Sequence, residues 1–186
     1  MTPPPEPPWF PIRTERLLLR ELRADDHDDM HAYASDPDTV RFMVWGPNTP
    51  EVTRERMAFV LDQQIRWPRD TVDLAVELVA ARRMIGSISL RLDGRGGAEF
   101  GYAYGSPWWR KGYGFEAAQA LATVAFGTLG LHRLQATCDV RNAGSIGVLE
   151  KLGMRREGTL LRNQRVCDGW RDTHIYGLLA DEWRAR

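Results

Sequence analysis

Cysteine is scarce in this 186-residue chain, net charge is zero, and long apolar runs are missing. The two cysteines, Cys138 and Cys167, fit neither a disulfide framework nor a zinc-ligand spacing, so we expect reduced thiols. Lysine plus arginine and aspartate plus glutamate both number 25, which provides no general attraction to nucleic acid or to a membrane surface. No run approaches the roughly 20 apolar residues of a membrane-spanning helix, and the N-terminus lacks the pattern of a secretory signal. We therefore expect a cytoplasmic protein that binds neither nucleic acid nor membrane directly.

Two common nucleotide-binding fingerprints and a metal-ligand cluster are also missing. A Walker loop needs Gly-Lys-Ser/Thr, but Gly112 is followed by Tyr113 and Gly114. A Rossmann fingerprint needs a third glycine and an acidic residue about 20 positions on, after a following strand, which this segment does not have. His27 and His31 have a metal-chelating spacing, but no third ligand accompanies them in the sequence. These absences argue against a nucleotide-binding module and against a metal centre.

Residues 98–127 form the most informative stretch, because they combine a strand, a glycine-containing loop and a long helix. Phe100, Tyr102 and Tyr104 alternate with small or polar residues, which indicates a strand. The residues that follow favour a turn, and an apolar stripe then predicts a largely buried helix. We place the first turn of this helix at residues 110–114.

Glycine is a costly choice in that first turn, because Gly112 and Gly114 each weaken a helix by roughly 1 kcal/mol relative to alanine. A missing Cβ lets a diphosphate approach the free N–H groups at a helix N-terminus, where the macrodipole is positive. Arg110 and Lys111 add full positive charge beside those groups. The residues alone leave two interpretations open: a diphosphate-binding loop, or a tight turn whose glycines serve packing.

The whole chain has the length of one domain, with strands and helices along its sequence. Six prolines fall within residues 1–11, so we expect residues 1–13 to form an extended arm and residues 14–186 to form the folded domain. Strands are expected at residues 16–22, 74–79, 84–92, 99–104, 132–140, 154–165 and 170–179, and further helices at residues 25–34, 50–66 and 142–152. This order predicts a mixed α/β (α+β) fold in which helices cover a single sheet.

The helix expected at residues 142–152 carries two polar side chains on its apolar face. Asn142, Ser145, Leu149 and Leu152 are spaced three or four residues apart, which places them on one side of a helix. In one interpretation Asn142 only caps the helix and Ser145 only permits close packing. In the other, both polar groups face a bound cofactor.

Two runs of residues resemble the signatures of the GNAT acyl-CoA N-acyltransferases. Trp109-Arg-Lys-Gly-Tyr-Gly-Phe-Glu-Ala, after a Glu-Phe-Gly-Tyr strand, resembles their pyrophosphate loop. Asn142-Ala-Gly-Ser-Ile-Gly-Val-Leu-Glu-Lys-Leu-Gly153 resembles their second signature, particularly in the RimJ/RimL branch of ribosomal-protein N-terminal acetyltransferases. The ending Asp168-Gly-Trp-Arg-Asp172 is also typical of that branch, and the likeness runs from about residue 14 to residue 183.

The resemblance implies a twisted, mostly antiparallel sheet with helices on both faces. Two parallel strands, those of Glu99 and Leu134, are expected to splay apart around acetyl-CoA, without a metal. The resemblance implies that these residues bind the cofactor: Tyr102, Ala103, Tyr104, Arg110, Lys111, Gly112, Tyr113, Gly114, Phe115, Asn142 and Ser145.

The resemblance further implies that a primary amine attacks the acetyl thioester directly. Glu99 occupies a strand position where relatives often carry an acid, and it is the candidate base, acting through water. A cross-strand pair with Arg91 is the alternative role for Glu99. Trp109 replaces the usual Gln or Arg at the head of the loop, as it often does in that branch, and backbone N–H groups remain available for the diphosphate.

A second departure concerns the group that assists the leaving thiolate. Leu149 stands where many relatives have a tyrosine that acts as general acid. The role then passes to Ser145, which that branch is thought to use, with Tyr102 or Tyr113 in reserve. A serine hydroxyl is a poor acid, so we expect Ser145 to donate a hydrogen bond to the sulfur.

We expect the acceptor to be the α-amine at a protein or peptide N-terminus. An α-amine with a pKa of about 7.7 costs only ~1 kcal/mol to neutralise at pH 7, whereas a lysine, at about 10.4, costs nearly 5. The apolar loop at residues 42–47 is either a wall of the acceptor site or local packing; Trp45, Glu99 and Trp170 are the candidate contacts. A small amine, such as a polyamine, an aminoglycoside-like or an amino-acid-like molecule, is the alternative acceptor. A non-catalytic CoA-binding module is the alternative function, and the chain is expected to be a monomer or a homodimer.

Overall fold

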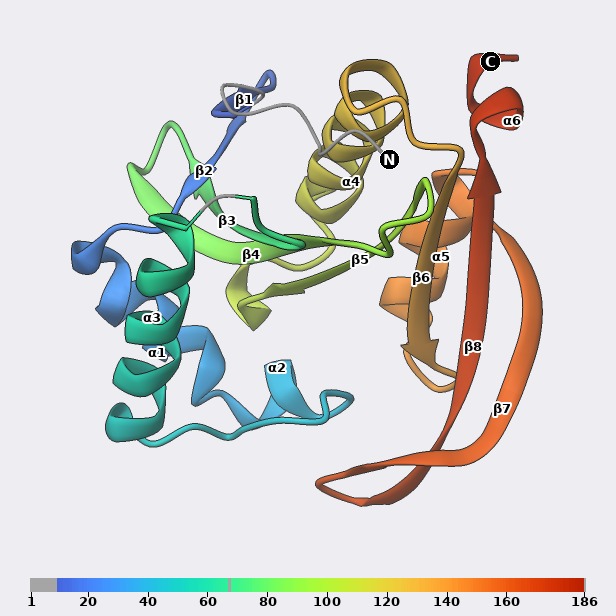
Figure 1. The fold of residues 1–186 in the computed structure, drawn as a ribbon. Coiled ribbons are helices and arrows are strands. Elements are labelled where there is room, and N and C mark those ends of the chain that lie inside the picture. Colours follow the sequence, from blue (N-terminus) through green and yellow to red (C-terminus); the bar gives the residue numbers. More distant parts are fainter. Residues whose placement is uncertain (1–9, 67, 186) are drawn as a thin grey trace.

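The computed structural model describes residues 10–66 and 68–185, which build one eight-stranded sheet (Figure 1). The strands lie in the order β1-β2-β3-β4-β5-β6-β8-β7. Every neighbouring pair is antiparallel except β5 and β6, which are parallel. The strands are β1 (Ile12–Arg13), β2 (Leu17–Glu21), β3 (Thr71–Leu78), β4 (Arg83–Leu92), β5 (Gly97–Tyr104), β6 (Arg133–Asp139), β7 (Arg155–Val166) and β8 (Gly169–Leu179).

Helices cover both faces of this sheet (Figure 1). They are α1 (His27–Ala34), α2 (Pro37–Val40), α3 (Pro50–Gln64), α4 (Tyr113–Thr123), α5 (Ala143–Lys151) and α6 (Ala180–Arg184). One apolar core lies between the sheet and the pair α4 and α5, and a second, smaller core lies between the sheet and the pair α1 and α3. We refer to these two sides as the α4–α5 face and the α1–α3 face. The structure thus confirms the mixed α/β fold with a mostly antiparallel sheet.

Alternation along β5 distributes its side chains between the two cores. Phe100 and Tyr104 are buried in the core of the α4–α5 face, and Tyr102 packs against that core. Ala103 belongs to the core of the α1–α3 face. Because successive side chains of a strand point to opposite faces, Glu99 lies on the same face as Ala103.

The start of α4 differs from the expected position. The helix begins at Tyr113, and the preceding Gly112 is its N-cap residue with a φ of +82°. Arg110 also has a positive φ, +59°. A right-handed helix needs negative φ values, so Arg110 and Gly112 lie before the helix rather than in its first turn.

The proline-rich arm ends earlier than residue 13. Ile12 and Arg13 form β1 and pair with Leu19 and Leu18 of β2, and Phe10 is buried in the core of the α4–α5 face. The folded domain therefore includes at least residues 10–13, because burial of an aromatic ring and strand pairing fix this segment to the sheet. Residues 1–9 of the expected arm lie outside the described residues.

β5 and β6 pair over only a short distance and then part. The pairs join Gly97 to Arg133, Ala98 to Leu134 and Glu99 to Gln135. Beyond them β5 continues to Tyr104 beside β4, and β6 continues beside β8, with no further pairs between the two strands. We call this opening the fork. It matches the splayed pair of strands that was expected around the cofactor.

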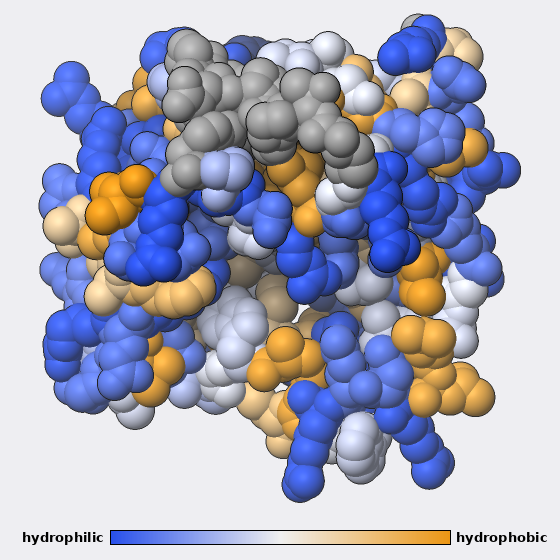
Figure 2. Space-filling model, viewed as in Figure 1, coloured by the Kyte–Doolittle hydropathy of each residue, from blue (hydrophilic) through white to orange (hydrophobic). Residues whose placement is uncertain are grey.

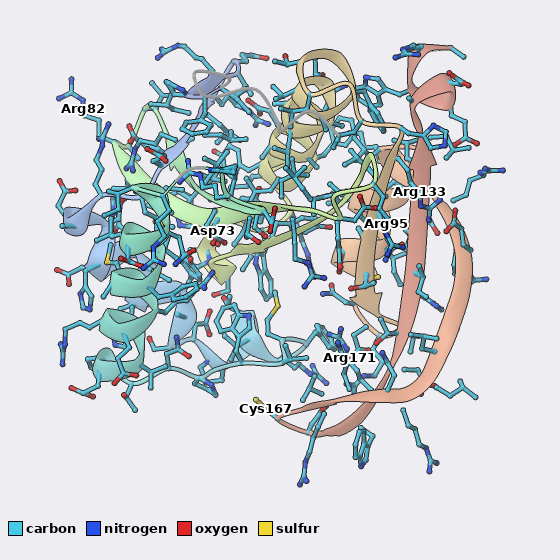
Figure 3. The ribbon with its side chains drawn as sticks, in the orientation of Figure 1. Asp73, Arg82, Arg95, Arg133, Cys167 and Arg171 are labelled. Carbon is cyan, nitrogen blue, oxygen red and sulfur yellow. The ribbon has the colours of Figure 1, made fainter. Side chains whose placement is uncertain are left out.

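A bridge closes the lower end of the fork in Figure 1, where the hairpin of β7 and β8 meets the segment at residues 42–46. Arg171 of β8 donates a hydrogen bond of 2.6 Å to the backbone oxygen of Phe42. At the hairpin turn, the Cys167 thiol lies 3.3 Å from the backbone oxygen of Gly46. Both side chains are labelled in Figure 3, at the end of the hairpin, and Figure 2 shows that the surface is hollowed above this bridge.

Candidate active site

Two groups of polar side chains meet at the fork from opposite faces of the sheet. Glu99 of β5 lies on the α1–α3 face, where Thr137 of β6 donates to its carboxylate over 3.4 Å. Tyr102, three residues along β5, lies on the α4–α5 face, where its hydroxyl is 2.9 Å from Ser145 Oγ. The odd spacing between Glu99 and Tyr102 dictates this separation, because side chains alternate along a strand. The arrangement leaves the fork between a carboxylate on one side and a pair of hydroxyls on the other.

Glu99 occupies the last paired position before the strands part. Its Oε2 lies 2.5 Å from Nη2 of Arg91, which is the residue directly opposite on β4. Oε1 faces β6, where Thr137 donates to it. About a third of the Glu99 side chain is exposed. The cross-strand pair considered from the sequence is therefore present, and the carboxylate still reaches the fork through its other oxygen.

Two hydrogen bonds hold Ser145 at the start of α5, one from its backbone N–H to Asn142 and one between its hydroxyl and Tyr102. The side chain of Asn142 accepts a hydrogen bond from the Ser145 backbone N–H at 3.0 Å, so Asn142 is the N-cap of α5. The Ser145 hydroxyl remains free of that task and pairs with Tyr102. Burial raises the pKa of Tyr102 far above its ordinary value. The tyrosine therefore stays protonated at neutral pH.

Cys138 of β6 adds a thiol to the same face. Burial raises its pKa to about 11, although a hydrogen bond with Ser145 acts to lower it. A thiol with this pKa is overwhelmingly protonated at neutral pH and is a weak nucleophile. Cys138 therefore packs beside the hydroxyl pair as a neutral group, consistent with direct transfer rather than an acyl-cysteine intermediate.

The loop before α4 forms a cradle of backbone groups at the position where the sequence predicts diphosphate binding. Gly112 has left-handed backbone geometry, and a Cβ placed on it would lie 3.3 Å from Nη2 of Arg16. Gly114, in the first turn of α4, lies so close to the ring of Tyr104 that a Cβ added to it would be 3.4 Å from that ring. The first N–H groups of a helix have no partner within the helix, and α4 presents them beside Arg110 and Lys111. The left-handed φ of Gly112 thus favours glycine at that position, and the cradle suits an anion.

Tyr104 ends β5 beneath this cradle with an unusual polar group. Its hydroxyl is buried and has no hydrogen-bond partner among the described residues. Burial raises its pKa far above the ordinary value for tyrosine. Its backbone oxygen, in contrast, accepts a hydrogen bond of 2.6 Å from the indole of Trp109 at the head of the loop. Trp109 therefore connects the loop to the end of β5, which gives a structural role to this departure from the usual Gln or Arg.

The loop at residues 42–47 and the hairpin of β7 and β8, which were expected to flank the acceptor, contact each other through Arg171. Arg171 is buried and donates to Phe42 O. Trp170 precedes it on β8 and therefore points to the opposite side of the hairpin, where 63% of its surface is exposed. Trp45 lies within the bridged segment and is partly exposed. Strand alternation therefore turns Trp170 away from Arg171, and the roles of Trp45 and Trp170 as acceptor contacts stay predictions.

Several residues near the fork were not identified from the sequence. Thr137 and Asp139 of β6 lie on the same face of the sheet as Glu99. Arg141 forms ion pairs with Asp139 and with Asp168 of the hairpin turn. The alternation of β6 was readable, but its register against β5 was not. The alternation shows which β6 side chains lie beside Glu99 only when that register is known.

The described part of the chain contains no group of three or more His, Cys, Asp and Glu residues arranged to hold a metal ion. His27 and His31 stack with ring centroids 6.1 Å apart, and His31 hydrogen-bonds Thr53. Their spacing on α1 thus serves local packing. In the same described ranges, none of the helices is long and apolar enough to cross a membrane.

Comparison with known proteins matches residues 16–155 to the acetyltransferase (GNAT) domain family. The chain belongs to this family. An uncharacterized N-acetyltransferase of Bacillus subtilis (strain 168), YnaD, is 33% identical over 177 residues, which cover 92% of this chain and 98% of that protein. A GNAT-family acetyltransferase crystal structure from Bacillus anthracis is 33% identical, with a TM-score of 0.81 over 92% of this chain and 99% of its own. The chain is thus an acetyl-transferring enzyme of the GNAT type, and the fork lies between its two splayed strands.

A more distant relative carries a named substrate. The [ribosomal protein uS5]-alanine N-acetyltransferase of Escherichia coli (strain K12) is 33% identical over 84 residues. The aligned segment covers 45% of this chain and 43% of that protein. The likeness therefore concerns about half of each chain.

Proposed function

We propose that this GNAT enzyme transfers an acetyl group from acetyl-CoA to the α-amine of a protein or peptide N-terminus. One observation carries the proposal: Glu99 and the Ser145 hydroxyl reach the fork from opposite faces of the sheet. Direct transfer needs a base on the side of the entering amine and a hydrogen-bond donor on the side of the departing sulfur. At the fork, the candidate base Glu99 and the candidate donor Ser145 lie on opposite faces of one sheet.

The cofactor would enter on the α4–α5 face. The N–H groups at residues 110–115 and the charges of Arg110 and Lys111 would hold its diphosphate, because a helix N-terminus with a nearby glycine binds anions. The edge of β5 turned toward the fork, from residue 100 to Tyr104, would pair with its amide-containing arm, since no strand of the described residues occupies that edge. Acetyl-CoA supplies the activated acetyl thioester; the chain supplies position and hydrogen bonds.

The acceptor would enter on the α1–α3 face. The segment at residues 42–46 lies on this side, because a Cβ built on Gly46 would meet the backbone oxygen of Ala34, which belongs to the core of the α1–α3 face. Glu99 would accept a proton from the ammonium through a water molecule. Thr137 would orient the carboxylate oxygen that faces the fork. The amine nitrogen then forms its bond to the acetyl carbon as the carbon–sulfur bond breaks.

Two considerations favour an N-terminal α-amine over a lysine side chain. Neutralising an α-amine at pH 7 costs ~1 kcal/mol, against nearly 5 for lysine, and the one carboxylate of Glu99 is enough to meet the smaller cost. The relative named for acetylation of ribosomal protein uS5 at alanine, together with the RimJ/RimL-like run at residues 142–153, supports the same class of acceptor.

The test is acetyl-CoA turnover with three matched acceptors. The first is a lysine-free peptide with a free N-terminus, the second is the same peptide with a blocked N-terminus and one lysine, and the third is a polyamine. We expect turnover with the first peptide and acetyl groups at its α-nitrogen by mass spectrometry. Acetylation only at lysine Nε, or turnover confined to the polyamine, would refute the N-terminal assignment.

A further inference from the structure

Tyr102 and Ser145 form a hydroxyl pair whose direction the geometry constrains. The Tyr102 hydroxyl lies 2.9 Å from Ser145 Oγ and 3.4 Å from the Ser145 backbone oxygen. A backbone oxygen can only accept, so both atoms of Ser145 near the phenol attract its single hydrogen. With Tyr102 as donor, Ser145 Oγ receives one hydrogen bond and its own hydrogen remains available to another acceptor.

The backbone of Ser145 is fixed independently of its hydroxyl. The Ser145 backbone N–H is already bound by Asn142, which fixes the residue at the start of α5. Cys138, on β6 across the fork, lies near Ser145 and is buried as a neutral thiol. Leu149, one turn further along α5, is fully buried and has no donor to offer.

We propose that Tyr102 is a positioning residue that acts through Ser145, given the acetyl transfer proposed above. Its O–H donates to Ser145 Oγ and so directs the serine O–H toward the departing sulfur. As the amine nitrogen bonds to the acetyl carbon, the electron pair of the carbon–sulfur bond stays on sulfur, and the serine hydrogen bond stabilises that thiolate. No proton leaves Tyr102 or Ser145. The first ammonium proton goes to Glu99 through water, and the second proton, which the nitrogen loses as the amide forms, goes to the thiolate, so CoA leaves as its thiol.

This arrangement strengthens the Ser145 hydroxyl, which is a weak acid, as a hydrogen-bond donor to the thiolate. A hydroxyl that accepts one hydrogen bond becomes a better donor in the next, because chains of hydrogen bonds polarise one another. Tyr102 is well suited to the outer position, since its ring packs against Phe100 and Tyr104, with centroids 6.1 and 5.9 Å away. The aromatic row holds the phenol in place, and a flexible donor would lack that restraint.

The first experiment is a double-mutant cycle with Tyr102→Phe, Ser145→Ala and the double variant. We expect Tyr102→Phe to lower kcat by about ten-fold, as one lost hydrogen bond to a developing charge would, with KM for acetyl-CoA little changed. In the Ser145→Ala background, Tyr102→Phe should have no further effect. Losses that multiply in the double variant would refute action through Ser145 and make Tyr102 an independent contributor.

Tyr33→Phe is the matched control. Tyr33 is also a buried tyrosine whose hydroxyl donates to a serine, Ser87, over 3.2 Å, but it belongs to the core of the α1–α3 face. The two variants remove the same atoms from the same kind of pair. We expect Tyr33→Phe to retain the parent kcat, and both variants to keep a cooperative thermal transition. An equal loss of kcat in both would reduce Tyr102 to a structural role.

A second readout needs no acceptor amine. In the complex with free CoA, the ionisation of the bound thiol can be followed by the ultraviolet absorbance of the thiolate. We expect Tyr102→Phe to raise the pKa of that thiol in the parent background and to leave it unchanged in the Ser145→Ala background. A pKa that stays the same in the parent background would refute the positioning role. This outcome is independent of which amine is acetylated, so failure of the N-terminal assignment would leave it intact.

Discussion

Arg91 and Glu99 face each other across β4 and β5, and their side chains form an ion pair with Nη2 2.5 Å from Oε2. The same carboxylate accepts a hydrogen bond from Thr137 across the fork. Glu99 therefore connects three strands at the point where the sheet opens. Arg91 holds one oxygen on the β4 side, which leaves the other directed to the space that an acceptor would enter.

The pair of variants Glu99→Gln and Arg91→Gln separates the catalytic role of the carboxylate from its structural one. We expect Glu99→Gln to reduce the rate by about ten-fold or more at low pH and by less as the pH rises, because more acceptor amine is then neutral without a base. Arg91→Gln keeps the carboxylate and should retain most of the activity. Equal, pH-independent losses in both variants would assign Glu99 to the ion pair alone.

Gly112 should tolerate neither charge nor bulk if the loop before α4 binds the diphosphate. We expect Gly112→Asp to abolish acetyl-CoA binding in calorimetry, because a carboxylate would face the phosphates at the helix N-terminus. Gly94→Asp is the control, since Gly94 also has a left-handed φ, +68°, but lies in the open turn between β4 and β5. Both variants carry similar backbone strain and the same added charge, so unchanged affinity of Gly112→Asp would contradict the assignment.

Tyr104→Phe should stabilise the protein in the absence of ligand. The substitution removes a buried hydroxyl that lacks a partner among the described residues, and such a group costs about 1 kcal/mol or more. We expect the free energy of unfolding in urea to rise by about that amount. Tyr33→Phe, which removes a hydroxyl bonded to Ser87, should instead lower it. A loss of stability in Tyr104→Phe would reveal that the hydroxyl is satisfied in solution.

Arg171→Met tests the bridge. The substitution keeps apolar volume but removes the hydrogen bond to Phe42 O, so the segment at residues 42–46 loses a tether to β8. We expect KM for the acceptor to rise about five-fold or more, with KM for acetyl-CoA little changed. Arg165→Met is the control, because Arg165 pairs with Trp170 and lies on the other side of the hairpin. A change in KM for acetyl-CoA alone would contradict a role of the bridge in acceptor binding.

Asp139 should make the free energy of unfolding fall as the pH is lowered into the acid range. Burial raises the pKa of its carboxyl, but hydrogen bonds from Arg141 more than offset this, and the folded-state pKa is lowered. Its contribution is therefore present above the unfolded value of about 3.9 and is lost as the pH falls through the folded-state pKa. We expect Asp139→Asn to unfold more easily at pH 7, by on the order of 1 kcal/mol, and to show a flatter acid limb in thermal melts. Parallel acid limbs for variant and parent would contradict this.

Local signals predicted the features that depend on neighbouring residues. The alternation of Phe100, Tyr102 and Tyr104 predicted β5, and the position of Asn142 before an apolar stripe predicted its capping role. The start of α4 was placed too early because a glycine pattern does not reveal whether Gly112 is helical or left-handed. Backbone conformation at that residue depends on its contacts, including those of Arg16 with the loop.

Features that depend on pairing between distant segments were beyond the sequence. The Tyr102–Ser145 pair joins residues 43 positions apart, and the Arg171–Phe42 bond joins residues 129 apart. Each requires the relative placement of β5, α5, β8 and the bridge, which no local pattern encodes. The side of the hairpin on which Trp170 lies depends on the same kind of information, because alternation places it opposite the buried Arg171.

The short junction at the base of the fork also has a consequence for how the protein opens. The portion from β1 to β5 and the portion from β6 to β8 share a few ladder hydrogen bonds near Ala98 and Leu134 and otherwise rely on helix packing and the bridge. Such weakly joined portions are expected to exchange their amide hydrogens as separate cooperative units. A ligand that contacts both sides of the fork would then link the two units. It would raise the protection of their amide hydrogens against exchange together, so that the two units unfold in one step rather than two.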